Sequence, residues 1–77
     1  MDLQGLVEYI AQHLVEEPDE VAVKVIEGSG SITVELRVAP GEAGRVIGKG
    51  GRIANAIRTL VRVAAAREGK RVNLEIV

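Results

Sequence analysis

VIGKGGRI, at residues 46–53, places three glycines and two cations between an apolar pair and a long helical pattern. Glycine has no Cβ, so it lets the backbone take positive φ and lets a second backbone approach closely. Lys49 and Arg52 bring positive charge to the start of the following helix, where free N–H groups favour an anion. We interpret this stretch as a clamp for the sugar-phosphate backbone of a nucleic acid.

Two nucleotide-binding patterns can be tested against the same residues, and both fail. A P-loop, G-x-x-x-x-G-K-[ST], needs glycine where Ala43 stands and a hydroxyl residue where Gly50 stands. A dinucleotide-binding G-x-G-x-x-G follows a strand and needs a third glycine where Ile53 stands. What remains is a G-x-x-G turn, Gly48–Gly51, between two helices.

Helical patterns flank this turn on both sides. Pro40-Gly41 breaks a preceding strand, so residues 42–47 have room for only a short helix. Residues 52–67 predict a long amphipathic helix. Its buried arc is expected to consist of Ile53, Ile57, Leu60, Val61 and Ala64. Its opposite side carries Arg52, Asn55, Arg58, Thr59 and Arg62.

The rest of the chain contains one more helical segment and three runs that alternate with period 2. Asp2 can cap a helix that continues to Glu16-Glu17-Pro18, because the residue before proline disfavours the α region. The alternating runs are residues 21–26, 32–38 and 72–76, with a Gly-Ser-Gly-Ser hairpin turn between the first two. The order α-β-β-α-α-β predicts a single α+β domain, residues 1–77. Its three-stranded mixed sheet should have the helices on one face.

Composition narrows the function classes. Residues 1–42 hold nine acids and two bases, whereas residues 43–77 hold eight bases and two acids. Charge segregated in this way is typical of a surface that binds a polyanion. With no Cys and a single His, the chain predicts no metal centre, no cofactor and no catalytic residues. Neither a signal peptide nor an apolar run of membrane-spanning length is visible, so we expect a cytoplasmic protein.

The glycine turn, the apolar pair before it and the element order together resemble the K-homology (KH) domain in its type II form. The chain length and the sequence from Gly44 to Leu60 are similar to the small stand-alone KH proteins of the bacterial KhpA family. The resemblance implies that the G-x-x-G (GXXG) loop clamps four nucleotides of single-stranded RNA. It also implies an RNA chaperone that forms homodimers or pairs with a KhpB-type KH protein. Such proteins act in cell length, cell shape and peptidoglycan homeostasis.

The residues expected to contact RNA lie in and beside the loop: Arg45, Ile47, Gly48, Lys49, Gly50, Gly51, Arg52 and Asn55. The N–H groups of residues 48–51 are expected to face phosphates. Bases are expected in an aliphatic groove between the helix after the loop and the strand at residues 32–38. With no Phe or Trp to stack on, binding should be weak and steeply salt-dependent, with low sequence specificity.

Two alternatives remain open. Ile53, Ala56 and Val63 widen the apolar side of the long helix, which favours a protein-interaction module in which RNA binding is secondary. The same glycines, followed by Arg52, Asn55 and Arg58, could instead form a helix-turn-helix that binds DNA.

Overall fold

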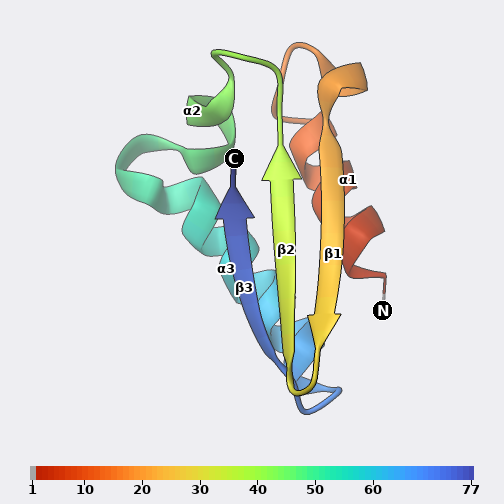
Figure 1. The fold of residues 1–77 in the computed structure, drawn as a ribbon. Helices are drawn as coiled ribbons and strands as arrows, with labels where there is room; N and C mark the ends of the chain where they lie inside the picture. The colour runs from red at the N-terminus through yellow and green to blue at the C-terminus, as the bar shows by residue number, and fades with distance from the viewer. Residues whose placement is uncertain (1) are drawn as a thin grey trace.

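The computed structural model describes residues 2–77, which follow the expected α-β-β-α-α-β order. The helices are α1 (Leu3–Gln12), α2 (Ala43–Ile47) and α3 (Arg52–Ala66), and the strands are β1 (Ala22–Gly28), β2 (Ser31–Arg37) and β3 (Arg71–Ile76). Short 3-10 turns stand at Pro18–Glu20 and Lys49–Gly51. Figure 1 shows α1 and α3 behind the sheet, with α2 near its upper end and no helix in front. The predicted α+β fold with helices on one face is therefore confirmed.

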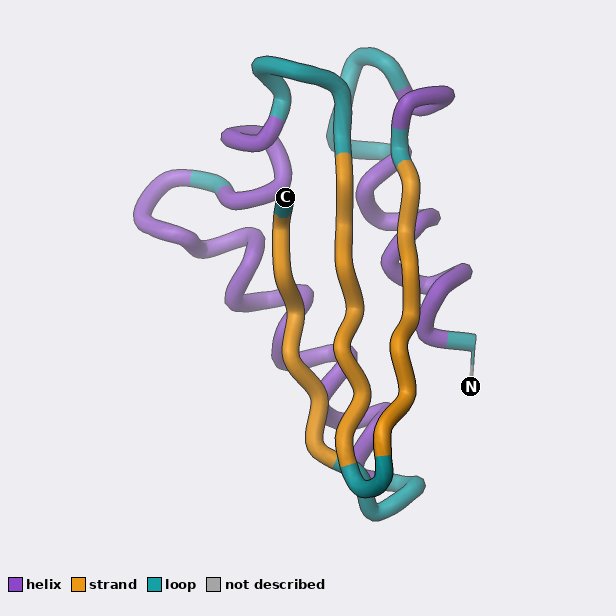
Figure 2. The backbone as a smooth tube through the Cα atoms, in the orientation of Figure 1, coloured by secondary structure: helices purple, strands orange, loops and turns teal. Residues whose placement is uncertain are grey.

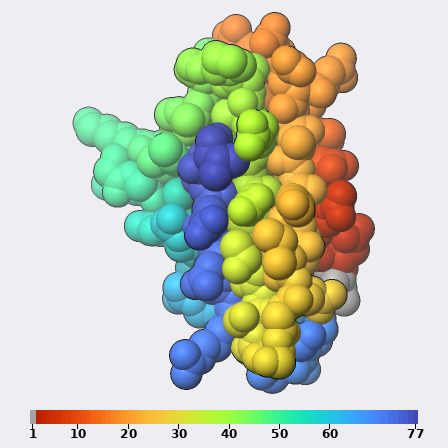
Figure 3. Space-filling view, viewed as in Figure 1, coloured from red at the N-terminus to blue at the C-terminus, as the bar shows by residue number. Residues whose placement is uncertain are grey.

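The central strand of the sheet is β2. It pairs antiparallel with β1 and parallel with β3, so that Val34 stands between Val25 and Leu74. Period 2 turns Ile32, Val34 and Leu36 toward the helices, where they are buried. The other face of the sheet is open to solvent, and Figures 2 and 3 show its three strands side by side. β1 and β3 are the two edges, and the α3 layer lies behind β3.

The first helix begins as predicted and ends earlier than predicted. The backbone N–H of Gly5 donates to Asp2 Oδ1 at 3.0 Å, which is an N-cap bond. The helix stops at Gln12 instead of reaching Glu16-Glu17-Pro18. The reason is a contact with Glu42, the residue before α2. Its carboxylate accepts hydrogen bonds from the N–H groups of Glu16 and Glu17 at 2.7 and 3.2 Å. Its buried carboxylate replaces the helical partners that these two amides would otherwise have had.

The long helix is rotated relative to the expectation. Leu60 was predicted to be buried, but 51% of it is exposed. Of the other predicted residues, Ile57, Val61 and Ala64 are buried and Ile53 is half-buried, and the buried side continues with Ala54 and Ala65. Three of these buried residues are alanines, and Leu60 lies outside the buried arc that they extend. The prediction for Leu60 was wrong because the larger side chain was given priority over the small ones.

Candidate nucleic-acid interface

The base of the glycine loop is closed by contact between Gly48 and Ile53. Gly48 has φ 77° and ψ 170°, a backbone conformation adopted almost only by glycine. A Cβ placed on Gly48 would lie 2.7 Å from Ile53 Cγ1 and 3.0 Å from the Ile53 backbone nitrogen. Ile53 is half-buried and packs against the core from beneath the loop. Its place in a protein interface stays a prediction. In the structure its side chain packs against Gly48 at the base of the loop.

The tip of the loop, Lys49 and Gly50, is open. Gly50 has φ 66° and ψ 16°, and a Cβ there would meet no atom within 4 Å. The N–H of Gly51 donates to the Gly48 carbonyl at 3.1 Å, and the N–H of Gly48 donates to the Gly44 carbonyl at 2.9 Å. Those two amides are therefore engaged, contrary to the expectation that all four face phosphates. Among residues 2–77, no partner holds the amides of Lys49 and Gly50, which leaves both able to bind an anion.

Further polar side chains lie beside the loop on the first turns of α3. The Asn55 amide nitrogen is 3.8 Å from the position a Cβ on Gly51 would take. Asn55 Oδ1 accepts a hydrogen bond from Arg58 Nη1 at 3.1 Å. Lys49 and Arg52 are exposed, as is Ile47 (39%) at the end of α2. None of the ion pairs among residues 2–77 uses the charges of Lys49, Arg52 or Arg58.

Arg45, by contrast, is held by carboxylates. Its Nη2 lies 2.9 Å from Glu16 Oε1, and its Nε lies 3.5 Å from Glu42 Oε1. Glu42 in turn caps the amides of residues 16 and 17, so Arg45 belongs to a cluster that fastens α2 to the turn after α1. Arg45 differs in this respect from Lys49 and Arg52, and its predicted contact with RNA stays a prediction.

A groove runs between α3 and the edge strand β3. It has a volume of about 280 Å³. Arg58, Val61 and Arg62 line it from α3, and Val72, Asn73, Leu74 and Glu75 line it from β3. The expected wall, residues 32–38, was wrong: these residues belong to the central strand β2, whose two edges are both paired.

Sequence reasoning missed the strand side of this groove and the position of Arg62 in its lining. The alternating run at the end of the chain predicts a strand, but it does not predict which edge of β2 that strand pairs with. One signal was available, because a strand that follows a helical crossover from β2 pairs with it in parallel, and the hairpin already occupies the other edge. That reasoning places β3, and with it Asn73 and Glu75, at the free edge beside α3.

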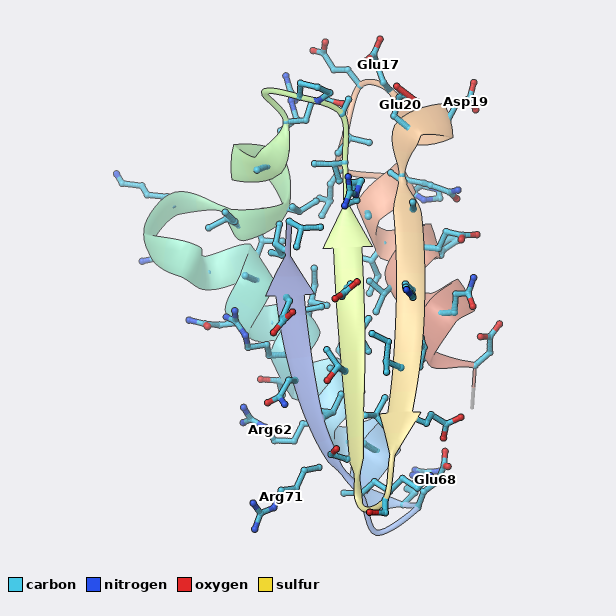
Figure 4. All side chains as sticks on the ribbon, viewed as in Figure 1. Glu17, Asp19, Glu20, Arg62, Glu68 and Arg71 are labelled. Atoms are coloured by element: carbon cyan, nitrogen blue, oxygen red, sulfur yellow. The ribbon has the colours of Figure 1, made fainter. Side chains whose placement is uncertain are left out.

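Charge on the molecule is divided between opposite sides. Figure 4 shows Arg62 and Arg71 projecting on the β3 side, whereas Glu17, Asp19 and Glu20 gather at the far upper end near the start of β1. The loop protrudes on the same side as the groove (Figure 3). These two groups of charges therefore lie well apart, whereas Glu68 lies at the lower end of the molecule.

No helix among residues 2–77 has the length and apolarity needed to cross a membrane. The same residues contain no group of three or more His, Cys, Asp or Glu side chains arranged to hold a metal ion.

A GXXG turn between two helices, beside the edge of a three-stranded mixed sheet with α-β-β-α-α-β order, defines a type II KH domain. A family model described as "KhpA/KhpB, KH domain" matches residues 4–76. The chain therefore belongs to the KhpA/KhpB KH-domain family.

Similar proteins carry names that agree with this assignment. "RNA-binding protein KhpA" of Clostridium acetobutylicum is 53% identical over 75 residues, which cover 97% of this chain and 100% of that protein. The protein of the same name from Caldanaerobacter subterraneus is 58% identical over 72 residues, covering 94% of this chain and 96% of the relative.

Solved structures of Era contain a similar fold. Aquifex aeolicus Era bound to GDP and aluminium fluoride superposes with a TM-score of 0.65 at 27% identity. Era in complex with MgGDPNP and nucleotides 1506-1542 of 16S ribosomal RNA gives a TM-score of 0.66 at 27% identity. Each match covers 96% of this chain but only 29% and 28% of the respective Era chains.

Proposed function

We propose that this protein binds single-stranded RNA through the tip of its glycine loop and the groove between α3 and β3. One observation carries the proposal: the amides of Lys49 and Gly50 are open at the protruding end of the loop, beside the exposed cations Lys49 and Arg52. Support comes from relatives that are named RNA-binding proteins and from an Era structure that contains 16S ribosomal RNA.

The contacts divide into two kinds. Phosphates bind the open amides and the cations of the loop, which position the strand without reading its sequence. Bases then lie over the apolar floor of the groove, formed by Val61, Val72 and Leu74. The single aromatic residue, Tyr9, is on α1 and outside the groove, so base stacking contributes little. Binding is therefore weak and salt-dependent, with modest sequence preference.

Replacing Gly50 tests this clamp, because Asp and Asn both tolerate its left-handed backbone and have nearly equal volume. Gly50→Asp puts a negative charge where a phosphate binds. We expect it to weaken binding of a fluorescein-labelled single-stranded RNA by about tenfold or more, measured by fluorescence anisotropy. Gly50→Asn is the matched control and should retain most of the affinity. Equal affinities for the two variants would mean that the loop does not bind phosphate.

The helix-turn-helix alternative is distinguished by a competitor. A recognition helix enters the major groove of DNA, which is about 12 Å wide. Here the basic side of α3 lines a groove that β3 closes on its other side, which suits one strand better than two. Unlabelled duplex DNA should therefore compete poorly with the labelled RNA. Competition equal to that of single-stranded RNA would favour the DNA-binding alternative.

A second candidate function is protein interaction. On α3, Ala56 is exposed together with Leu60 (51%) and Val63 (56%), and the three form an apolar stripe away from the groove. We propose that this stripe pairs two copies of the chain or binds a KhpB-type partner. By family resemblance we further propose an RNA-chaperone role in the cytoplasm, connected to cell length and peptidoglycan homeostasis.

Light scattering tests the stripe. Leu60→Ser with Val63→Ser should shift a dimer toward monomer while RNA affinity per chain at the loop is retained. Ile26→Ser is the control, since it removes a large exposed apolar side chain (43%) from the open sheet face. A wild-type protein that is monomeric alone and with the added KhpB-type partner would remove this second function.

A further inference from the structure

We propose that Glu75 selects among nucleobases in the groove and favours guanine. The proposal rests on the RNA-binding function proposed above and names a residue that determines its specificity. It starts from an asymmetry between the two rims of the groove. Arg58 and Arg62 stand on the helix rim, whereas Asn73 and Glu75 stand on the strand rim.

This asymmetry orients an RNA strand. Guanidinium groups attract phosphates and often bind them in a bidentate manner, whereas a carboxylate repels them. The sugar-phosphate backbone therefore follows the α3 rim, which continues directly from Lys49 and Arg52 of the loop. Bases that extend from that backbone across the groove reach the β3 rim with their hydrogen-bonding edges. Glu75 is thus placed where base edges arrive.

The charge of Glu75 is available for this role. Within residues 2–77, the ion pairs join Arg45 to Glu16 and Glu42, and Lys70 to Glu27, and none involves Glu75. Its partner across the sheet in β2 is another acid, Glu35. Glu35 also stands opposite Lys24 of β1, so the favourable cross-strand charge pair of Glu35 is with Lys24, and Glu75 has only a like charge opposite it. Glu75 is also exposed, so a ligand can reach it.

The chemistry of a carboxylate then predicts the base. An ionised carboxylate only accepts hydrogen bonds, so it prefers an edge with two adjacent donors. Guanine presents N1–H and the N2 amino group side by side. Cytosine and adenine present one amino group next to an acceptor nitrogen, and uracil presents N3–H between two carbonyl oxygens. The expected order is guanine first and uracil last.

The test uses short oligonucleotides of uridine with one central position varied as guanosine, inosine or uridine. Fluorescence anisotropy at one salt concentration gives the dissociation constants. We expect wild-type protein to prefer the guanosine oligonucleotide over all-uridine by about fivefold or more, the lower end for a bidentate base contact. Inosine lacks the N2 amino group and should fall between the two. Glu75→Gln should bind the all-uridine strand more tightly and bring the guanosine preference close to one.

Glu35→Gln is the matched control. It removes the same charge from the neighbouring position of β2, on the same face of the sheet but outside the groove lining. It should raise affinity for all three oligonucleotides alike and keep the preference. Equal wild-type affinities, or equal loss of preference in Glu35→Gln and Glu75→Gln, would overturn the proposal and leave RNA binding intact. Failure of wild-type protein to bind any of the strands would instead overturn the proposed function itself.

Discussion

The base and the tip of the glycine loop each contain a glycine, Gly48 and Gly50, but the surroundings of these two glycines differ. At the base, Gly48 leaves no space for a side chain because Ile53 lies 2.7 Å from where its Cβ would be. At the tip, Gly50 has 4 Å of open space around the same position. Both residues have positive φ, but their ψ angles differ: Gly48, at ψ 170°, is in a region adopted almost only by glycine, whereas Gly50, at ψ 16°, is left-handed. The first glycine builds the loop, and the second keeps its amide accessible.

The GXXG motif of this chain therefore has two parts, a base and a tip, with different structural surroundings. The base positions α3 against α2 and belongs to the folding of the domain. The tip presents Lys49 and two amides without a hydrogen-bond partner among the described residues, and in the proposed function it is the part that binds RNA. Variants of the base should therefore affect mainly stability, and variants of the tip should affect mainly affinity.

The largest effect is expected at the base. Gly48→Ala meets both a glycine-only backbone conformation and a clash with Ile53, so we expect the free energy of unfolding to fall by about 2–5 kcal/mol. Thermal denaturation followed by circular dichroism measures this loss. For a domain of this size each kcal/mol corresponds to about 4–8 °C in Tm.

Gly50→Ala provides the matched comparison. It imposes a left-handed backbone on alanine, at a cost of about 1–2 kcal/mol, but meets no neighbouring atom. Its Tm should therefore fall clearly less than that of Gly48→Ala. If both variants melt at the same temperature, the contact with Ile53 has no energetic weight, and the distinction between base and tip is lost.

Most of the fold could be predicted because period 2 and the caps are local signals. The alternation in residues 32–38 predicted a strand, and β2 has Ile32, Val34 and Leu36 buried on one face. Asp2 correctly marked the start of α1. The end of α1 could not be predicted from neighbouring residues. It depends on Glu42, which lies 26 positions from Glu16 in the sequence and binds its amide.

The candidate site was only partly predictable for the same reason. The loop glycines and Lys49 can be recognised from the glycine-rich composition of the stretch alone. The commitment of Arg45 to Glu16 depends on a contact across 29 positions, which no local pattern contains. The wall of the groove depends on which edge of β2 pairs with β3. The buried side of α3 was partly mispredicted because Leu60 was assigned to it before the alanines. Long-range pairing and the closeness allowed by small residues were the missing information.

A smaller effect is expected in the salt dependence of RNA binding. It distinguishes Lys49, at the tip of the loop, from Arg45, in α2. Lys49→Gln and Arg45→Gln each remove one positive charge, so the net charge changes equally. Each phosphate contact on a single strand contributes about −0.7 to the slope of log K against log salt concentration. Lys49→Gln should reduce the magnitude of that slope by about this amount.

Arg45→Gln should leave the slope unchanged, because its guanidinium is engaged by Glu16 and Glu42. Titrations of labelled RNA at several salt concentrations give both slopes. An exposed ion pair contributes at most about 1 kcal/mol to stability, so the Arg45 variant stays folded and its slope can be measured. An equal fall in slope for both variants would mean that Arg45 leaves its carboxylates to bind phosphate. The binding surface would then extend past the base of the loop into α2, and Gly48 would lie within the contact instead of beneath it.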